Sequence, residues 1–305
     1  MSHELRFQAM ILPNVGWDAL LSRFRHVEDL GFDLASTGDH FCDWSNPPSP
    51  WFELWGVLAG VAQGTDRIRL APCVAQIPLR NPAMFARQAL TVDHISGGRL
   101  EVGLGLGLPI DPSYDMIGME NWSNPKRVTR FTEYVEIVDQ MLSQEVTTYL
   151  GEHYQVNQAT MNPRSPQSPR PPITVAALGP IMVKKAVVYA DTWNTMSFAE
   201  TFDQQLGETR TRIDMALAHC DKIDRDPATL RISYNMFDPG SRASGGRISY
   251  YESPDAFADQ AGQLLNLGIN EISVYYPMLE EQVPVFETIA RDVLPGIRAS
   301  NNPAS

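Results

Sequence analysis

An adjacent carboxylate and imidazole, Asp39 and His40, are the residues of this chain best suited to acid–base chemistry. An imidazole titrates near neutral pH and can either donate or accept a proton. The pair follows a strand-like run, residues 32–38, which comes directly after a helical pattern ending at Gly31. Parallel β/α enzymes carry their catalytic residues at the carboxyl ends of strands. We therefore predict that Asp39 and His40 are catalytic, the alternative being a helix-capping aspartate beside a packed histidine.

Eight strand-like segments, nearly all separated by helical patterns, run through the chain. They are residues 5–13, 32–38, 68–77, 99–105, 173–177, 191–196, 230–237 and 270–276. Repeated β-α units favour a parallel sheet, and eight of them favour closure into a barrel. We therefore expect an α/β fold, a single (β/α)8 TIM barrel domain that spans residues 1–305.

Three long segments interrupt this alternation. Residues 106–125 follow the fourth strand, residues 145–172 precede the fifth, and residues 239–253 follow the seventh. Five prolines within residues 162–172 indicate ordered coil, because proline is poorly tolerated inside helices. The two segments that follow strands should lie on the face of the catalytic pair, and the glycines of residues 239–253 make that segment a candidate lid.

The overall composition argues against several classes of protein. The chain has 305 residues and a formal net charge of -12, whereas nucleic-acid binding needs a basic face. Its three cysteines form no C-x-x-C pair, which disfavours a zinc cluster or a disulfide framework. The first strand offers no metal ligand, which disfavours a metal hydrolase. No segment resembles a secretory leader or a membrane span, so we expect a cytoplasmic enzyme with a small-molecule substrate.

Two groups of glycines at predicted strand ends could accommodate a cofactor. Gly103, Gly105 and Gly107 alternate along one face, where missing side chains leave room either for a flat group or for close packing inside the barrel. Residues 177–180 join the fifth strand to a helix, whose free amides could bind a phosphate. An ordinary β-α turn is the alternative for that segment.

Side chains near other strand ends could shape a substrate pocket. The candidates are Trp44, Trp51, Asn235 and Tyr275. The tryptophans follow the second strand and could equally anchor their own loop. Cys73 ends the third strand without an evident basic partner, so we interpret it as a small buried side chain and not as a nucleophile.

These residues belong to longer motifs that resemble the luciferase-like monooxygenase family, which comprises flavin- and deazaflavin-dependent oxidoreductases on a β/α barrel. The most specific stretches are Asp39-His40-Phe41 and residues 50–55, 80–105 and 189–194. The resemblance covers about the whole chain. It also implies a homodimer, because barrels of this family often dimerise.

Within the family, the Asp-His pair resembles the branch that uses coenzyme F420, a deazaflavin. The resemblance implies that Asp39 contacts the cofactor and that His40 is the acid or proton relay. It also implies a non-proline cis peptide at Cys73-Val74, which supports the cofactor ring, and a phosphate-binding turn at residues 177–180. The predicted cofactor-binding residues are Asp39, Cys73, Val74, Ala75, Gly105, Leu106, Gly107, Ala176, Ala177, Leu178, Gly179 and Pro180.

One position departs from the sugar-phosphate dehydrogenases of this branch. They carry a catalytic glutamate just beyond the fourth strand, where this chain has Leu108. The resemblance therefore implies hydride transfer between F420 and a less polar organic substrate. An FMN-dependent monooxygenase that uses molecular oxygen is the first alternative, and a non-catalytic flavin-binding protein is the alternative from another class.

Overall fold

The structure, a computed structural model, describes residues 3–238 and 246–301. Its main sheet is parallel and has the strand order β3-β2-β1-β11-β10-β9-β8-β5-β4. The strands are β1 (Arg6–Met10), β2 (Leu34–Thr37), β3 (Arg69–Pro72), β4 (Ala75–Gln76), β5 (Val102–Gly105), β8 (Ile173–Ala176), β9 (Thr192–Thr195), β10 (Arg231–Asn235) and β11 (Glu271–Tyr275). Each predicted strand is present, and the predicted α/β barrel is confirmed.

The third predicted strand is split into β3 and β4 by Cys73 and Val74. β3 pairs with β2, whereas β4 pairs with β5, so the interrupted strand closes the ring between its two neighbours. A further bridge joins Leu70 to Leu100. The interruption places a stretch of irregular backbone at the carboxyl end of the barrel, beside the ends of β2 and β5.

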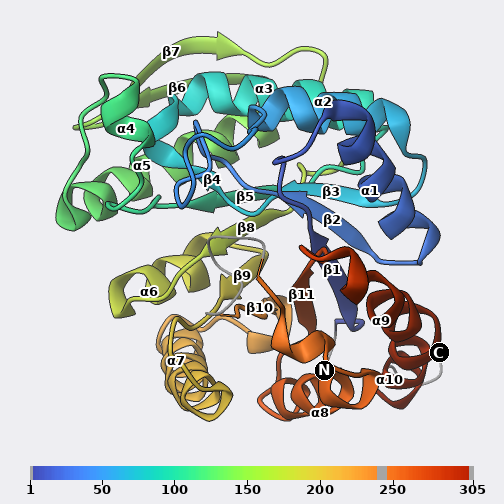
Figure 1. Ribbon diagram of the computed structural model, residues 1–305. Coiled ribbons are helices and arrows are strands. Elements are labelled where there is room, and N and C mark those ends of the chain that lie inside the picture. Colours follow the sequence, from blue (N-terminus) through green and yellow to red (C-terminus); the bar gives the residue numbers. More distant parts are fainter. Residues whose placement is uncertain (1–2, 239–245, 302–305) are drawn as a thin grey trace.

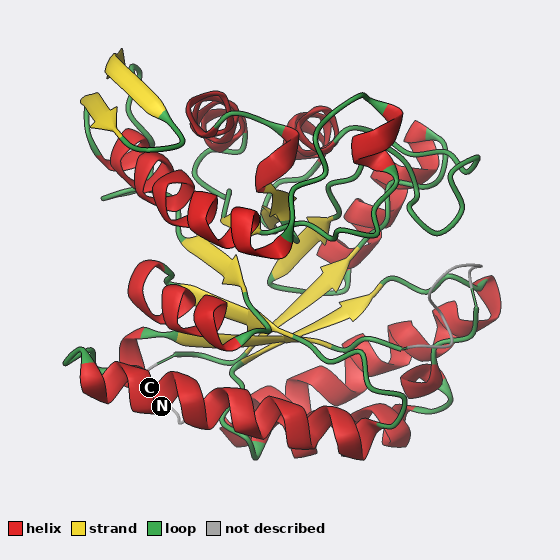
Figure 2. Ribbon diagram, turned by 90° about the vertical axis from the view of Figure 1, so that its left-hand side faces the viewer, coloured by secondary structure: helices red, strands yellow, loops and turns green. Residues whose placement is uncertain are grey.

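Helices cover the outside of this sheet (Figures 1 and 2). They are α1 (Trp17–Asp29), α2 (Leu54–Gly64), α3 (Pro82–Ile95), α5 (Asn124–Ser143), α6 (Pro180–Tyr189), α7 (Phe202–Lys222), α8 (Pro254–Leu265), α9 (Val283–Thr288) and α10 (Leu294–Asn301). The sequence also marks their starts. Asn81 accepts a hydrogen bond from the amide of Ala83 with Pro82 at the first helical position, as its residue type predicts.

Aromatic side chains join the helices over the β3–β5 side of the barrel. The ring of Phe85 (α3) meets the ring of Trp55 (α2) edge to face at 5.2 Å and that of Tyr134 (α5) at 5.8 Å. All three side chains are buried. Such pairs stabilise a core beyond their buried area, by about 0.5–1.5 kcal/mol each. They hold α2, α3 and α5 in fixed positions behind the strand ends that carry Asp39 and His40.

A charged cluster closes the amino-terminal end of the barrel. Arg6 and Arg69 bind the same oxygen of Glu101 at 2.7 and 2.6 Å, and Arg6 Nε donates to Glu271 at 2.9 Å. Both carboxylates are buried. Burial raises the pKa of Glu101, but attraction from the two arginines outweighs it, so the net shift is downward. Glu101 is therefore ionised between the two arginines.

The segment between α5 and β8 contains a feature that the sequence analysis missed. β6 (Val146–Leu150) and β7 (Gln155–Thr160) form an antiparallel hairpin outside the barrel (Figure 1). Glu133 of α5 accepts hydrogen bonds from the amides of the hairpin turn, at 2.9–3.0 Å. Most side chains of both strands are exposed, so the apolar alternation that indicates a strand is absent from their sequence. The proline-rich residues that follow form irregular structure, as predicted.

The segments after β5 and β10 differ in how much of them is described. Residues 106–125 fold over the carboxyl end of the barrel and contain the short helix α4 (Ser113–Met116). In the predicted lid, residues 239–245 lie outside the described residues, and Ser249–Tyr251 forms a 3₁₀ turn. Within the described ranges, the structure has no helix with the length and apolar character needed to span a membrane.

Candidate active site

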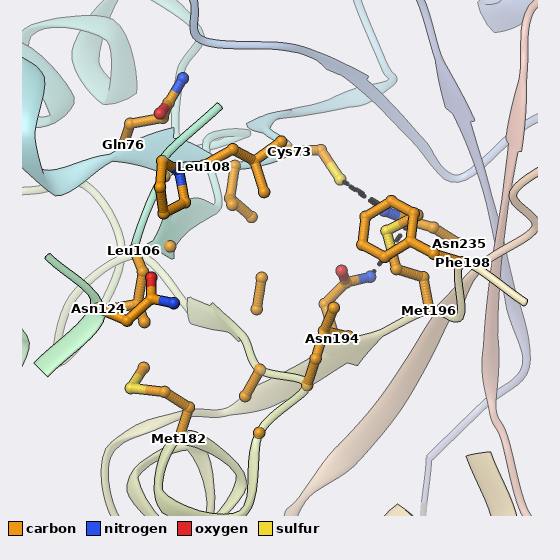
Figure 3. A pocket seen from close by; sticks show the side chains of 18 of the residues that line it. Cys73, Gln76, Leu106, Leu108, Asn124, Met182, Asn194, Met196, Phe198 and Asn235 are labelled. Carbon is orange, nitrogen blue, oxygen red and sulfur yellow. Dashed lines mark hydrogen bonds between the residues drawn. The ribbon is translucent and has the colours of Figure 1, made fainter. Parts of the chain in front are cut away.

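A cavity of about 570 Å³ lies at the carboxyl ends of the barrel strands (Figure 3). The structure brings most of the predicted site residues into its lining: His40, Cys73, Val74, Gly105, Leu106, Gly107, Ala176, Ala177, Leu178, Gly179, Pro180, Asn235 and Tyr275. They come from β5, β8, β10 and β11 and from the segments that follow β2, β3, β5 and β8. Strands distant in sequence thus meet around one cavity, as a closed parallel barrel requires.

Four predicted residues lie outside this lining, namely Asp39, Ala75, Trp44 and Trp51. Asp39 is buried behind His40, where its carboxylate binds Arg80 (Nη2 to Oδ1, 3.0 Å) and accepts a hydrogen bond from the amide of Gln76 at 2.8 Å. Trp51 meets the edge of the His40 ring, with ring centroids 5.6 Å apart. In this arrangement Asp39 and Trp51 hold His40 in place.

His40 has a partner that the sequence analysis did not identify. Its Nδ1 lies 2.6 Å from Oδ2 of Asp111, a buried residue in the segment after β5. Ser113, two residues further on, accepts a hydrogen bond from the amide of Phe41 at 3.0 Å, so the segment is attached both to the His40 ring and to the backbone that follows it. The only signal in the sequence was a carboxylate within an insertion expected on the catalytic face.

Asp111 is ionised in this environment. Burial would raise the pKa of its carboxyl group, but hydrogen bonds from His40, Gln76 and Ser113 outweigh burial and lower the pKa to about 2. The amide of Ser113 donates to Oδ1 at 2.8 Å, while Gln76 Nε2 donates to Oδ2 at 2.9 Å. A fixed negative charge therefore faces the imidazole on the side away from the cavity.

The floor of the cavity is formed by the interruption between β3 and β4. The peptide bond between Cys73 and Val74 is cis, as the family resemblance implies. Asn235 Nδ2 lies 3.4 Å from Cys73 Sγ, and Asn194 Nδ2 donates to Asn235 Oδ1 at 3.1 Å (Figure 3). Burial raises the pKa of the Cys73 thiol. The thiol is thus protonated at neutral pH, in agreement with its interpretation as a small packed side chain.

The space around Gly103, Gly105 and Gly107 favours close packing over room for a flat group. An added Cβ would lie 2.1 Å from the Pro72 carbonyl oxygen at Gly103 and 2.5 Å from a methyl group of Val74 at Gly105. At Gly107, which has a φ of +74°, it would collide with Gln76 and Tyr114. These glycines are needed for packing around the interrupted strand. Gly105 and Gly107 line the cavity as well, but protein atoms already occupy the space beside their Cα atoms.

Gly179 is different, because an added Cβ would meet no protein atom within 4 Å. It precedes α6, where Pro180 has no amide hydrogen and Val183 donates the first helical hydrogen bond, to Gly179 O at 2.9 Å. The amides of Ile181 and Met182 in the first turn therefore have no partner within the helix. Such a helix end is suited to an anion, since both the amides and the helix dipole favour negative charge.

Two side chains fix the turn before α6 from behind. Arg212 donates to the carbonyl oxygens of Leu178 (3.1 Å) and Met196 (2.7 Å), and the Trp193 indole donates to Ala177 O at 3.0 Å. Leu178 and Met196 both line the cavity. The turn is thus held in one conformation by residues that lie outside the lining.

The remaining lining residues are mostly apolar, and except for Leu108 the sequence analysis did not assign them a role in the site. They are Met10, Gln76, Leu108, Pro109, Asn124, Val128, Ile181, Met182, Asn194, Met196 and Phe198. Figure 3 shows Leu106, Leu108 and Asn124 on one side of the cavity, with Met196 and Phe198 on another. Among the described lining residues, none is lysine, arginine, aspartate or glutamate.

Comparison with known proteins agrees with this architecture. Residues 2–237 match the luciferase-like monooxygenase family. The chain is 25% identical to an F420-dependent glucose-6-phosphate dehydrogenase of Intrasporangium calvum, over 93% of this chain and 98% of that one. It is 31% identical to an F420-dependent glucose-6-phosphate dehydrogenase of Kineococcus radiotolerans, over 74% of this chain and 70% of that one.

The fold is shared with a solved coenzyme F420-dependent tetrahydromethanopterin reductase from Methanopyrus kandleri. The two structures superpose with a TM-score of 0.78 over 96% of this chain and 99% of the reductase, at 20% sequence identity. The family match covers well over half of the chain. This protein therefore belongs to the luciferase-like monooxygenase family, and the predicted family resemblance is confirmed.

Proposed function

We propose that this protein transfers a hydride between C5 of coenzyme F420 and a small, uncharged organic substrate, and that His40 moves the accompanying proton. The observation that carries the proposal is the pairing of two features in one cavity: an imidazole on one wall and an open helix terminus on another. The protein is an F420-dependent oxidoreductase of its family, in keeping with the relatives named for that coenzyme.

The cavity fits the parts of this cofactor. The first-turn amides of α6 would hold its phosphate, with Gly179 leaving the approach open. Ala176, Ala177 and the irregular backbone at Cys73-Val74 would border the flat ring, since none of these positions carries a large polar side chain. When bound, the deazaflavin supplies the hydride chemistry, while the protein supplies position and electrostatics.

We assign to His40 the transfer of the proton to or from the substrate. Among the described lining residues it is the only imidazole, a group that can both donate and accept a proton, and its side chain is 16% exposed. Asp39 stays behind it in an ion pair with Arg80, so we assign to Asp39 the placement of the His40 backbone beside the cofactor. The proposed catalytic pair is thus His40, which acts on the substrate, with Asp39 in support.

The apolar lining favours an uncharged substrate with one reducible bond or one hydroxyl group. A sugar phosphate carries a dianion, which needs cationic partners when it leaves water. The described lining offers none, and Leu108 occupies the place of the glutamate expected in sugar-phosphate dehydrogenases. Asn124, Asn194 and Asn235 could instead hydrogen-bond a carbonyl or hydroxyl group.

An assay with and without oxygen tests the proposal. Oxidised F420 would be offered with a panel of alcohols and with glucose 6-phosphate, and reduced F420 with ketones, aldehydes and enones, while cofactor fluorescence is recorded. We expect turnover of an uncharged member of the panel at equal rates under argon and air. Turnover only with FMN and oxygen would make the protein a monooxygenase, and the absence of turnover with both cofactors would favour a binding protein.

We also propose a homodimer that works in the reducing cytoplasm. The dimer rests on the frequency of dimers in the family, and sedimentation velocity would measure it directly. Cys42, Cys73 and Cys220 are free thiols, which is the state expected in a reducing compartment. A monomer at micromolar concentration would contradict the proposed homodimer. Export of the native protein from its cell would contradict the proposed cytoplasmic location.

A further inference from the structure

A chain of buried hydrogen bonds leads to His40 from Arg127, a residue outside the cavity lining. The Arg127 guanidinium is buried, and it can only donate hydrogen bonds. Its Nη1 donates to the carbonyl oxygen of Leu106 at 2.7 Å and to the hydroxyl oxygen of Tyr114 at 3.2 Å. The guanidinium also lies over the Tyr114 ring, 4.8 Å from its centroid. Arg127 therefore fixes one end of the chain as a donor.

The donor Arg127 fixes the orientation of the next two residues in the chain of hydrogen bonds, Tyr114 and Gln76. Burial raises the pKa of the Tyr114 hydroxyl, which consequently keeps its proton. Because the Tyr114 oxygen accepts from Arg127, its hydrogen is directed to the other neighbour, Gln76 Oε1. The Gln76 amide is thereby oriented with its nitrogen toward Asp39 and Asp111. The reverse orientation would place Oε1 against two oxygen acceptors.

Gln76 has two amide hydrogens, and both have an acceptor. Nε2 donates to the carbonyl oxygen of Asp39 and to Oδ2 of Asp111, the latter at 2.9 Å. Nε2 also lies 3.0 Å from Nδ1 of His40, but no hydrogen remains for that contact. His40 Nδ1 must therefore be satisfied by Asp111 alone.

Asp111 determines which nitrogen of His40 carries the proton. Its Oδ2 lies 2.6 Å from His40 Nδ1, and an ionised carboxylate can only accept. Two lone pairs would repel each other at that separation, so Nδ1 carries a hydrogen. Among the described residues, the other ring nitrogen, Nε2, has no hydrogen-bond partner, and His40 lines the cavity.

The other charges near the ring are compensated. Asp39 precedes His40 in the chain and forms an ion pair with Arg80, which also contacts Glu53 at 3.4 Å. On the remaining side the edge of the ring meets uncharged Trp51. Asp111 is thus the charged group that binds the imidazole directly.

We propose that Asp111 is a positioning residue, which holds His40 with a permanent hydrogen on Nδ1 and presents Nε2 as the site of proton exchange with the substrate. The proposal rests on the function proposed above. In the direction of carbonyl reduction, His40 would give its Nε2 proton to the substrate oxygen, and the bound cofactor would supply the hydride that adds to the substrate carbon. His40 is left neutral with the Nδ1 hydrogen in place, and solvent returns the Nε2 proton.

Nitrogen NMR of the protein without cofactor gives a test that does not depend on turnover. The six histidines would be labelled with ¹⁵N, and a His40→Gln variant would identify the signals of His40. We expect a protonated Nδ1 and an unprotonated Nε2 in the neutral form. The opposite tautomer in the wild-type protein would overturn the proposal, and because this measurement needs no Asp111 variant, a folding defect cannot obscure it.

Substitutions of Asp111 and of a control residue then test whether the tautomer of His40 affects catalysis. Asp111→Asn should give a mixture of tautomers, with kcat lowered about tenfold, part of what a general acid contributes, and an altered pH profile of kcat. Its affinity for F420 should stay within a few-fold. Asp115→Asn is the matched control, because it removes the same charge from an exposed position on α4. Its His40 tautomer and its kcat, including the pH profile of kcat, should match wild type.

The NMR and kinetic results test the role of Asp111 separately from the proposed F420-dependent function. The predicted tautomer together with no F420 binding would reject the cofactor and leave the role of Asp111 in place. F420-dependent turnover together with equal kcat values and pH profiles for wild type and Asp111→Asn would reject the role of Asp111 and leave the function intact.

Discussion

Two buried polar networks lie at opposite ends of the same barrel, and they differ in whether they are complete. At the amino-terminal end, Arg6 and Arg69 bind Glu101, and Arg6 also binds Glu271, so each charged group there faces an opposite charge. At the carboxyl end, the chain of hydrogen bonds stops at His40, whose Nε2 has no partner among the described residues. The complete network stabilises the fold, whereas the incomplete one presents a reactive atom.

The comparison also explains which end of the barrel carries the side chains suited to chemistry. The amino-terminal cluster arises directly at the starts of β1, β3 and β11 and just before β5, from strand residues whose side chains meet across the ring. The carboxyl-terminal network needs Asp111, Tyr114 and Arg127 from the segment after β5 and the start of α5. Chemistry is therefore located where loops of variable length supply additional groups.

Glu101→Gln should have the largest effect and should be confined to stability. The variant leaves two partly buried arginines with a single carboxylate, which we expect to lower the free energy of unfolding by about 3 kcal/mol. Glu281→Gln removes a carboxylate from an exposed pair with Arg247 and should cost about 0–1 kcal/mol. Denaturant unfolding followed by tryptophan fluorescence measures both. An equal midpoint for Glu101→Gln and wild type would show that the cluster does not stabilise the fold.

His40→Asn should have the next largest effect and should be confined to catalysis. Loss of the proton-transfer group is expected to lower kcat about 100-fold, while the affinity for F420 stays within a few-fold. His94→Asn is the matched control, because His94 is exposed on α3 and bonds the carbonyl oxygen of Arg164. Steady-state kinetics with the substrate found in the panel decides the result. Unchanged kcat in His40→Asn would show that the network at the carboxyl end does not present a reactive atom.

Asp111 should make a pH-dependent contribution to stability. Its carboxyl pKa is lowered from 3.8 to about 2 in the folded protein. A carboxylate with a lowered pKa stabilises the fold above its unfolded pKa, and that contribution is lost as the pH falls through the folded pKa. The shift corresponds to about 2 kcal/mol.

Unfolding curves of wild type and Asp111→Asn, recorded between pH 2 and pH 7, measure this contribution. The difference between their unfolding free energies should be present above pH 4 and should disappear as the pH approaches 2. The same difference at pH 2 and pH 7 would show that packing, and not the charge of Asp111, is responsible.

Gly179→Val should have the smallest of these effects, an approximately tenfold loss of F420 affinity, or about 1.4 kcal/mol. The added side chain meets no protein atom at its Cβ, and the backbone of Gly179 is extended (φ -82°, ψ 155°), so we expect no loss of stability. Gly207→Val makes the same change on exposed α7 and should bind F420 like wild type. F420 affinities are measured by fluorescence titration. Equal values for Gly179→Val and Gly207→Val would show that the F420 phosphate does not bind at the start of α6.

The eight barrel strands could be predicted because each combines apolar residues with a turn signal, and His40 could be predicted because it follows a strand directly. The β6–β7 hairpin could not, since its exposed side chains show no alternation. Asp111 could not either. Its role depends on how residues 106–125 fold back over the barrel, and no local pattern in the sequence specifies that path.

Two interpretations from the sequence depend on contacts that only the structure shows. The alternation of Gly103, Gly105 and Gly107 was equally consistent with ligand clearance and close packing, and only the distances from an added Cβ favour packing. Asp39 was assigned to the cofactor by resemblance, but its carboxylate binds Arg80, a residue 41 positions away in the chain. Contacts over such separations depend on the tertiary fold.

A paired titration of the wild-type protein with F420 and FMN would show whether the cavity is built for a deazaflavin. Cofactor fluorescence would be followed at one salt concentration and one pH, with Gly179→Val measured in parallel. Tighter binding of F420 than of FMN, weakened about tenfold in the variant, is the predicted result. Tighter binding of FMN would contradict the proposed use of F420 and make an oxygen-using flavin enzyme the better description of this protein.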